Sequence, residues 1–403
     1  MKRLVRKVIP QKAINLFRHL PTAVLANLIY GFPSKKMTVI GVTGTDGKTT
    51  TVNMIYQILK SAGKAVSMVS TINAEIAGKS YDTGFHVTNP DPMLLQKFIK
   101  LAKTQNQQYL VLEVTSHGLD QFRAWGVKFD IGVITNITHE HLDYHGNWEN
   151  YFKAKATLIK NVRVAVLNHA EKHFDRLKKL TSGKVVSFGL TKQADFHPLK
   201  FPLKLSLPGE YNLQNALAAA AAAVNLGIDS KTIKSALESF NTLEGRMNDV
   251  PNDKGIKIYV DFAHTPFALE QSLKALRPKT KGKLIAVFGS AGARDVEKRG
   301  LMGGISAQLA DLSVITAEDP RGELEKINAQ ILEGAQKKGG ELGKNVFIEG
   351  DRQKAIEFAI NSLAKKGDVV GIFGKGHEKS LNYDGKTETP WSDHEAVKKA
   401  LKH

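Results

Sequence analysis

The feature that most constrains the fold is the segment GVTGTDGKTTT at residues 41–51, which joins a short apolar run to a helical pattern. A glycine-bearing turn, a lysine and hydroxyl side chains at a helix start are typical of a loop that binds nucleotide phosphates. The spacing differs from the standard phosphate loop, because Val42 stands where that pattern has glycine and the glycine here is Gly44. A plain strand–helix turn is the alternative, and the coincidence of strand, lysine and helix argues against it. We therefore predict an α/β domain that holds a nucleoside triphosphate at this loop.

Apolar runs of strand length alternate with helical patterns along most of the chain, which is typical of a doubly wound parallel sheet. A second series of such runs begins near residue 242 with IKIYVDF and ends with DVVGIFG. We predict a P-loop-type central ATPase domain over residues 38–241, with a mostly parallel sheet, and a C-terminal Rossmann-like α/β domain over residues 242–403. Polar groups at the strand ends of the two sheets are expected to face one another across a cleft.

Composition excludes several classes of site. The chain has no cysteine, which excludes disulfides, thiolate zinc sites and cysteine nucleophiles and is consistent with a cytoplasmic protein. The formal charge is +18, but no basic motif is interleaved with the aromatic residues that stack on bases, so we expect no nucleic-acid partner. No apolar run approaches the roughly 18–20 residues of a transmembrane helix.

The first 45 residues contain eight lysines and arginines and no acidic residue. We predict that residues 1–37 are a short basic segment made of a helix at KAINLFRHL and a linker. Such a helix either lies on an anionic lipid surface or packs on the rest of the protein.

Polar clusters follow several predicted strands. Glu113 closes the run YLVLEV, and the histidine-rich segment TNITHEHLDYHG at residues 135–146 follows another strand. Thr49 and Glu113 offer the hydroxyl and carboxylate oxygens that Mg²⁺ prefers, and the phosphate loop beside them favours this interpretation. For a strand-end glutamate alone, a helix cap or a salt bridge is the alternative.

The order of short motifs along the chain resembles the Mur ligase family. The motifs are TGTDGKTT, EVTSHGLDQFR, HLDYHG, YFKAKATL, GEYNLQNALAA, LEGRM, VDFAHTP, DPRGE and GKGHE, from about residue 38 to the C-terminal end. Within the family the chain is most similar to the UDP-N-acetylmuramoyl tripeptide synthetases (MurE type), which add the third amino acid of the peptidoglycan stem. The resemblance implies an ATP- and Mg²⁺-dependent amide ligase in which a carboxylate becomes an acyl phosphate and an amine then attacks it.

The resemblance also implies the residues of the site. The catalytic residues would be Lys48, Glu113, His141 and Lys155. The metal ligands would be Thr49, Glu113, His141 and Lys155, the last as a carbamylated lysine. The ATP-binding residues would be Gly44, Thr45, Asp46, Gly47, Lys48, Thr49, Thr50, Asn215, Arg246 and Asp261, with His264 near Asp261. Contacts to the muramoyl peptide would come from Thr88, Thr115, Ser116 and Arg123, and contacts to the incoming amino acid from Arg294, Asp319, Arg321, Gly374 and Glu378.

The chain departs from the family pattern in two places. Asp319 stands where the family often has the asparagine of D-N-P-R, and only about 37 residues precede the central domain, too few for the usual UDP-binding domain. We expect a monomer that adds meso-diaminopimelate, or else lysine, to a muramoyl dipeptide with or without UDP. The alternatives are a folylpolyglutamate or poly-amino-acid synthetase, and a non-catalytic ATP-binding module.

Overall fold

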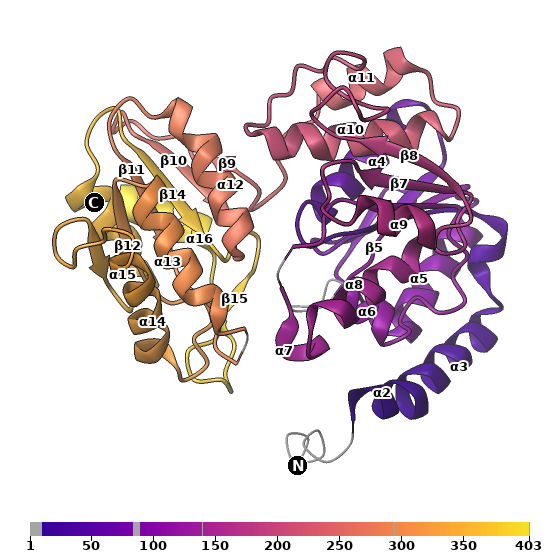
Figure 1. Ribbon diagram of the computed structural model, residues 1–403, viewed down its shortest axis with the longest axis horizontal. Helices are drawn as coiled ribbons and strands as arrows, with labels where there is room; N and C mark the ends of the chain where they lie inside the picture. Colours follow the sequence, from indigo (N-terminus) through magenta and orange to yellow (C-terminus); the bar gives the residue numbers. More distant parts are fainter. Residues whose placement is uncertain (1–9, 84–88, 139, 294, 403) are drawn as a thin grey trace. The chain divides into compact units, whose positions relative to one another are not determined.

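The computed structural model describes residues 10–83, 89–138, 140–293 and 295–402, which fall into two compact units (Figure 1). The first unit holds most of the described residues up to Phe240. The second holds the chain from Asn241 onward together with the short segments Glu140–Tyr144 and Ser206–Glu210.

The first unit is built on an eight-stranded sheet in the order β4-β3-β2-β5-β1-β6-β7-β8. The six strands from β2 to β8 in this order are parallel, and β3 and β4 form an antiparallel edge. The strands are β1 Thr38–Thr43, β2 Val66–Val69, β3 Ala74–Ile76, β4 Lys79–Tyr81, β5 Tyr109–Glu113, β6 Ile131–Ile134, β7 Val164–Asn168 and β8 Lys184–Phe188. β1 lies between β5 and β6, so the phosphate loop leaves the sheet at its centre.

Local sequence signals set the helices of this unit. Asp91, Asn147 and Asp229 each accept hydrogen bonds from backbone N–H groups at the start of the helix that follows. The alanines at 216 and 218–223 of α10 are fully buried, which allows close packing. The helices are α4 Lys48–Ser61, α5 Pro92–Thr104, α6 Ser116–Asp120, α8 Trp148–Ala156, α9 Phe174–Leu180, α10 Glu210–Val224 and α11 Ser230–Glu238, while the short helix α7 Leu142–His145 lies mostly in the segment that belongs to the second unit.

The N-terminal segment differs from its prediction in extent. Helical structure runs without a break through α2 Gln11–Ile14, a π-helical turn at Asn15–His19 and α3 Leu20–Tyr30. The predicted helix at KAINLFRHL is therefore present, but the prediction that a linker follows it directly is wrong, because the helix extends to Tyr30. The helix continues because AVLANLIY at residues 23–30 contains no helix breaker and buries Ala23, Ala26 and Asn27, and it stops at Gly31, which has a left-handed φ of 68°.

The second unit has a six-stranded sheet in the order β13-β12-β11-β14-β10-β9, in which only β9 is antiparallel. Its strands are β9 Asn248–Asp249, β10 Lys257–Asp261, β11 Leu284–Phe288, β12 Leu312–Ile315, β13 Val346–Ile348 and β14 Val369–Phe373. Its helices are α12 Pro266–Leu276, α13 Glu297–Leu309, α14 Leu324–Gln336, α15 Arg352–Glu357 and α16 Asp393–Leu401, and β15 Ser380–Leu381 pairs with β16 Thr389–Pro390.

The predicted fold class is confirmed: both sheets are mostly parallel, and helices connect most of their strands. Alternate apolar residues of β10, β11 and β14 pack with α15 and α16 in the core of the second unit. The cleft between the sheets stays a prediction. None of the described helices is long and apolar enough to cross a bilayer.

Candidate active site

The loop between β1 and α4 requires glycine at two positions. Gly47 has a φ of 81°, and a Cβ there would lie 2.3 Å from Oδ1 of Asn215. A Cβ at Gly44 would lie 1.7 Å from Oγ1 of Thr135. The glycines therefore let the loop pack against neighbouring side chains, a constraint that acts before any phosphate binds. Asn215 lies against the loop through this packing.

Side chains hold the loop in shape. Nζ of Lys48 donates to the carbonyl oxygen of Thr45 at 2.7 Å. The backbone N–H groups of Thr45 and Asp46 donate to Oδ1 of Asn136 at 3.1 and 2.9 Å. Because those two N–H groups already have an acceptor, the N-terminal end of α4 and the Lys48 ammonium are the groups best placed for phosphate. Asn136 was not predicted.

Glu113 and Thr49 meet at the end of the sheet. Oγ1 of Thr49 lies 3.0 Å from Oε1 of Glu113, which is almost fully buried. Thr71, which was not predicted, donates to the same carboxylate through its hydroxyl at 2.7 Å and its N–H at 2.9 Å. This set of hydroxyl and carboxylate oxygens is the kind that a hard divalent cation prefers, so these residues fit Mg²⁺.

Lys155 is buried beside the loop, whereas Lys153 on the same helix is exposed. Nζ of Lys155 donates to the carbonyl oxygen of Gly44 at 2.5 Å and lies 4.7 Å from the centre of the Tyr151 ring. The Tyr151 hydroxyl is 2.8 Å from Oγ1 of Thr45, so α8 is joined to the loop by two contacts. This position argues against an ordinary surface lysine.

The two histidines of HLDYHG belong to different compact units, His141 to the second and His145 to the first. His141 lies in the segment Glu140–Tyr144, which packs with the second unit, while Thr49, Glu113 and Lys155 belong to the first. His141 has a left-handed φ of 58°, and its Nδ1 is 3.8 Å from Oε1 of Glu140. His141 and the other three predicted metal ligands thus belong to different compact units, and their grouping around one metal site stays a prediction.

Asn89 connects two of the predicted acceptor-binding residues. Its Oδ1 accepts from the N–H and the hydroxyl of Thr115 at 2.7 and 2.8 Å, and its Nδ2 donates to the carbonyl oxygen of Glu113 at 2.6 Å. Nη1 of Arg123 donates to the carbonyl oxygen of Asn89 at 2.5 Å. Thr115 and Arg123 are thus brought together by an asparagine that was not predicted, although it directly follows the predicted Thr88 in the sequence.

Three other predicted substrate-binding residues have few or no described contacts. Ser116 is buried in α6, and its hydroxyl has no hydrogen-bond partner among the residues that the structure describes. The predicted contacts of Thr88 and Arg294 lie outside the described residues.

Asp261 holds a turn of its own unit. Its Oδ2 accepts from the N–H of Met247 at 2.8 Å, and its Oδ1 accepts from the N–H of Ala263 at 2.9 Å. Burial raises the pKa of Asp261, and Arg246 and these N–H groups oppose that rise. The Arg246 guanidinium lies over the Phe262 ring, 4.6 Å from its centre. The structure thus places Asp261 and Arg246 at one turn.

His264 follows the same strand and is neutral. Its Nδ1 lies 3.0 Å from the carbonyl oxygen of Phe262, and burial lowers the pKa of His264 to about 3. Lys298 donates to its carbonyl oxygen at 3.0 Å.

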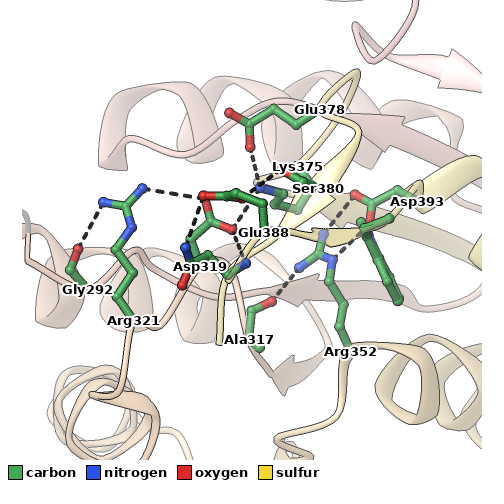
Figure 2. A network of polar contacts seen from close by, with 12 residues as sticks. Gly292, Ala317, Asp319, Arg321, Arg352, Lys375, Glu378, Ser380, Glu388 and Asp393 are labelled. Carbon is green, nitrogen blue, oxygen red and sulfur yellow. Dashed lines mark hydrogen bonds and ion pairs between the residues drawn. The ribbon is translucent and has the colours of Figure 1, made fainter. Parts of the chain in front are cut away.

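The predicted amino-acid-binding residues form an ion cluster in the second unit (Figure 2). Nζ of the fully buried Lys375 lies 3.0 Å from Oδ1 of Asp319 and also donates to Glu378. Burial alone would lower the pKa of Lys375, but Glu378 and Asp319 raise it above its usual value. The N–H of Asn382 donates to the same Oδ1 of Asp319 at 2.9 Å. Asp319 is therefore neutralised by a lysine that was not among the predicted residues.

Arg321 is only loosely held at the edge of this cluster. Its Nη2 is 3.6 Å from Oδ2 of Asp319, its Nη1 donates to the carbonyl oxygen of Gly292 at 3.4 Å, and its side chain is 24% exposed (Figure 2). Asp319 and Arg321 flank a proline with left-handed φ values of 55° and 51°. Such strained residues are typical of functional sites, and the two contacts of the Arg321 guanidinium are long and therefore weak.

Glu318 is a second buried acid, next to Asp319, and it was also missed. Burial raises the pKa of Glu318 to about 8, against the opposing charges of Lys298, Lys375 and Arg352. A Cβ at Gly374 would lie 2.9 Å from its Oε2, which has no hydrogen-bond partner within the described part of the chain. Gly374 is therefore required for the carboxyl group to fit.

A buried ion pair between Arg352 and Asp393 lies next to the cluster. Nε and Nη2 of Arg352 donate to the two carboxylate oxygens of Asp393 at 2.8 Å each, and Nη1 donates to the carbonyl oxygen of Ala317 at 3.0 Å (Figure 2). Both charged side chains are fully buried. This pair ties the start of α16 to the backbone just before Glu318.

Comparison with known proteins gives matches along nearly the whole chain. The Mur ligase middle domain matches residues 42–223, and the Mur ligase, glutamate ligase domain matches residues 245–376. The chain is 36% identical over 392 residues to UDP-N-acetylmuramoyl-L-alanyl-D-glutamate–2,6-diaminopimelate ligase 1 of Clostridium acetobutylicum, covering 90% of this chain and 80% of that protein. The corresponding ligase of Aquifex aeolicus is 37% identical, with coverage of 93% and 80%.

Solved structures agree with the sequence matches. A structure of a UDP-N-acetylmuramoyl-L-alanyl-D-glutamate–2,6-diaminopimelate ligase is 30% identical, has a TM-score of 0.61, and covers 92% of this chain and 79% of that chain.

Proposed function

The chain belongs to the Mur ligase family, and we propose that it joins meso-diaminopimelate to a muramoyl dipeptide with cleavage of ATP to ADP and phosphate. The predicted family and the ATP- and Mg²⁺-dependent ligase activity are confirmed by its relatives. The two relatives named above are both diaminopimelate ligases that act on UDP-N-acetylmuramoyl-L-alanyl-D-glutamate. This substrate pair is the most direct expectation for the present chain.

The phosphate loop binds ATP in this proposal. The N-terminal end of α4 and the ammonium of Lys48 attract the phosphates, and Thr49 and Glu113 hold Mg²⁺ with Thr71 beside them. Bound Mg²⁺ would neutralise charge that develops on the transferred phosphoryl group. The chain's own contribution is to fix these oxygens at the end of the sheet before ATP arrives.

Lys155 carries a carbamate in this proposal. Burial disfavours a charged ammonium, and the neutral amine is the form that reacts with CO₂. Its nitrogen bonds to the carbon of CO₂ and loses one proton to solvent, which gives an anionic carbamate whose oxygens would bind a second metal ion. The carbamate nitrogen keeps one N–H, so the hydrogen bond to the Gly44 carbonyl oxygen survives the modification. The loop and the second metal site would then be joined through one side chain. His141 is the other proposed ligand of that ion.

The acceptor site is proposed at Thr115, Ser116 and Arg123. Nε and Nη2 of Arg123 donate to Oε1 of Gln121 at 3.1 and 2.8 Å, and Asn89 holds the other end of the guanidinium. A fork fixed in this way suits the carboxylate or pyrophosphate of the acceptor. Asn215, Arg246 and Asp261 are proposed to contact the adenosine part of ATP, and Thr88 and Arg294 the acceptor and the amino acid.

Arg321 is proposed to select the amine. The distal end of diaminopimelate carries a carboxylate that lysine lacks, and a guanidinium binds a carboxylate through two charge-assisted hydrogen bonds. Asp319 already shares its charge with Lys375, so it neither saturates Arg321 nor presents a bare negative charge to the ligand. Glu378 is proposed to contact the ammonium, and Gly374 leaves room beside it.

The observation that carries the ligase proposal is the convergence of Glu113, Thr49 and the buried Lys155 on one phosphate loop. The test is phosphate release from ATP over a panel of acceptors, namely the muramoyl dipeptide with and without UDP and a folyl glutamate, each with diaminopimelate, lysine or glutamate. We expect release with a muramoyl dipeptide and diaminopimelate, and a product with the mass of the tripeptide. Release only with the folyl acceptor would identify the other ligase class, and ATP binding without release would indicate a non-catalytic module.

We also propose that the protein is a monomer in the cytoplasm, where ATP is available. Light scattering at several protein concentrations tests the first part, and fractionation of cells tests the second.

A further inference from the structure

The N-terminal helix exposes a row of large apolar side chains. Phe17 is 78% exposed, Leu25 54% and Leu28 62%, and Leu16 and Ile29 beside them are more than half exposed. Phe17, Leu25 and Leu28 recur at intervals of eight and three residues, which places them on one side of a helix. Contiguous exposed apolar side chains mark surfaces that bind a partner.

The opposite side of this helix is fixed to the first unit. Nδ2 of Asn15 donates to Oδ2 of Asp120 at 2.6 Å, and Nδ2 of Asn27 donates to the carbonyl oxygen of Trp125 at 2.7 Å. Ala23 and Ala26 are fully buried on that side. The helix therefore presents its apolar row outward as a permanent feature of the folded unit.

Positive charge surrounds the apolar row. Residues 10–36 contain no acidic residue, and their basic side chains lie at exposed positions: Lys12, Arg18, Lys35 and Lys36. Near the end of the helix, the partly exposed Trp125 ring lies 6.3 Å from the Phe32 ring, and Nζ of Lys35 lies 4.5 Å from the Phe32 centre. Apolar residues flanked by lysine, arginine and tryptophan are typical of helices that lie in a membrane interface.

We propose that this face, made of Leu16, Phe17, Leu25, Leu28 and Ile29 with the basic residues around them, docks on an anionic phospholipid surface. A second copy of the chain is a poorer partner, because pairing the same face with itself brings like charges together. None of the described helices can span a bilayer, so the helix would lie along the surface and keep the phosphate loop in water. The basic residues would bind the phosphate headgroup of the lipid, and the apolar row would contact its acyl chains.

The test is binding of the full chain to phosphatidylglycerol–phosphatidylcholine vesicles and to pure phosphatidylcholine vesicles, measured by flotation at low and high salt. We expect binding to the anionic vesicles that weakens with salt, since basic residues near the surface supply part of the attraction. Trp125 fluorescence, recorded after Trp148→Phe and Trp391→Phe, should shift to shorter wavelength on binding.

Variants of exposed residues separate the contributions. The triple variant Phe17→Ser, Leu25→Ser, Leu28→Ser should bind anionic vesicles at least about tenfold more weakly. Its matched control is Leu199→Ser, Leu301→Ser, Leu342→Ser, which changes three apolar residues of similar exposure elsewhere and should bind as the wild type does. Lys12→Glu with Arg18→Glu should weaken binding by about tenfold or more, unlike Lys192→Glu with Lys281→Glu, which changes the net charge equally.

The outcomes decide between partners. No binding of the wild type to anionic vesicles at low salt, or equal binding by the apolar triple variant, would overturn the proposal. A wild-type dimer that the triple variant abolishes, without vesicle binding, would assign the face to a second copy instead. Unchanged ATP binding and thermal unfolding in each variant show that the fold is intact.

Discussion

The two candidate sites hold their positively charged side chains in different ways. In the first unit, Lys48 and Lys155 donate to main-chain carbonyl oxygens of the phosphate loop, and two glycines in that loop have no room for a Cβ. In the second unit, Lys375 and Arg352 are bound to carboxylates of residues far away in the sequence. The first site is thus shaped by backbone, and the second by a balance of side-chain charges.

This difference predicts different responses to mutation. A backbone-shaped loop has one productive geometry, so a change there should affect catalysis strongly and with little dependence on pH. A cluster of buried charges can redistribute protons and ion pairs when one member changes. Changes in the second unit should therefore alter amine selectivity and the pH dependence of stability, by smaller amounts.

The largest effect is expected for Lys155→Ala. We predict that ligase activity falls by about a thousandfold or more, roughly 4 kcal/mol, because the variant cannot carry the carbamate. ATP binding should persist, since Lys48 and the start of α4 are unchanged. Native mass spectrometry of the wild type should show an added mass of one CO₂.

The matched control is Lys153→Ala, two residues away on the same helix with its side chain 66% exposed, which should keep activity within about twofold. Full ligase activity in Lys155→Ala would contradict the carbamate proposal and also the contrast drawn between the two sites.

The second effect in size is expected for Arg321→Ala. With lysine bound, the guanidinium lacks the carboxylate that diaminopimelate provides, which we expect to cost about 3 kcal/mol, or roughly a hundredfold in selectivity. The measurement is kcat/KM for each amine in the wild type and the variant. Arg277→Ala, which removes an exposed arginine paired with Asp311, is the control. A wild-type preference for lysine, or a variant that still prefers diaminopimelate, would show the assignment to be wrong.

The third effect concerns the pH dependence of stability. The pKa of Glu318 is about 8 in the folded protein because of burial, above the ordinary value of 4.5. The folded state therefore keeps a proton that the unfolded state has lost. Its contribution to stability is complete below about pH 4.5 and is lost as the pH rises through about 8. Glu318→Gln should remove this loss, on the order of 2 kcal/mol after relaxation around the carboxylate.

Trp391 allows the second unit to be followed alone, because its Nε1 donates to Asp393 in that unit. Urea unfolding from pH 5 to pH 9, in a background where Trp125 and Trp148 are phenylalanine, should show a flatter profile for Glu318→Gln. Glu325→Gln, an exposed change on α14, should keep the wild-type profile. Parallel profiles for all three proteins would mean that Glu318 does not titrate in this range.

The sequence predicted what is local and missed what depends on distant partners. The phosphate loop and the alternation of strands and helices depend on residues that are neighbours in the sequence, so the fold class could be predicted directly. Asn136 contacts the loop across about 90 positions, and Lys375 meets Asp319 across 56. Residue type alone gave no reason to choose that asparagine or that lysine, and Glu318 was passed over although it stands in the same motif. The extent of the N-terminal helix depends on the packing of Ala23, Ala26 and Asn27 against the rest of the first unit, which the local sequence does not reveal.

The smallest effect is expected for Asp319→Asn, which restores the amide of the family motif. Both residue types tolerate a left-handed φ, so the backbone at this position should be unaffected. Lys375 would lose one of its two carboxylates and keep Glu378, which limits the loss of stability. Arg321 would lose a weak attraction from an oxygen 3.6 Å away and become more available to the ligand.

We therefore predict that the KM for diaminopimelate falls by about fivefold or less, roughly 1 kcal/mol, with kcat unchanged within about twofold. The decisive measurement is a double-mutant cycle with Arg321→Ala, because Asp319 and Arg321 are close enough to couple. If Asp319 acts through Arg321, its substitution has no effect on KM once Arg321 is absent. A KM that rises in the single variant, together with easier unfolding of the second unit, would mean instead that the charge of Asp319 is needed to keep Lys375 in place. In that case the second site would be as dependent on one fixed geometry as the phosphate loop is.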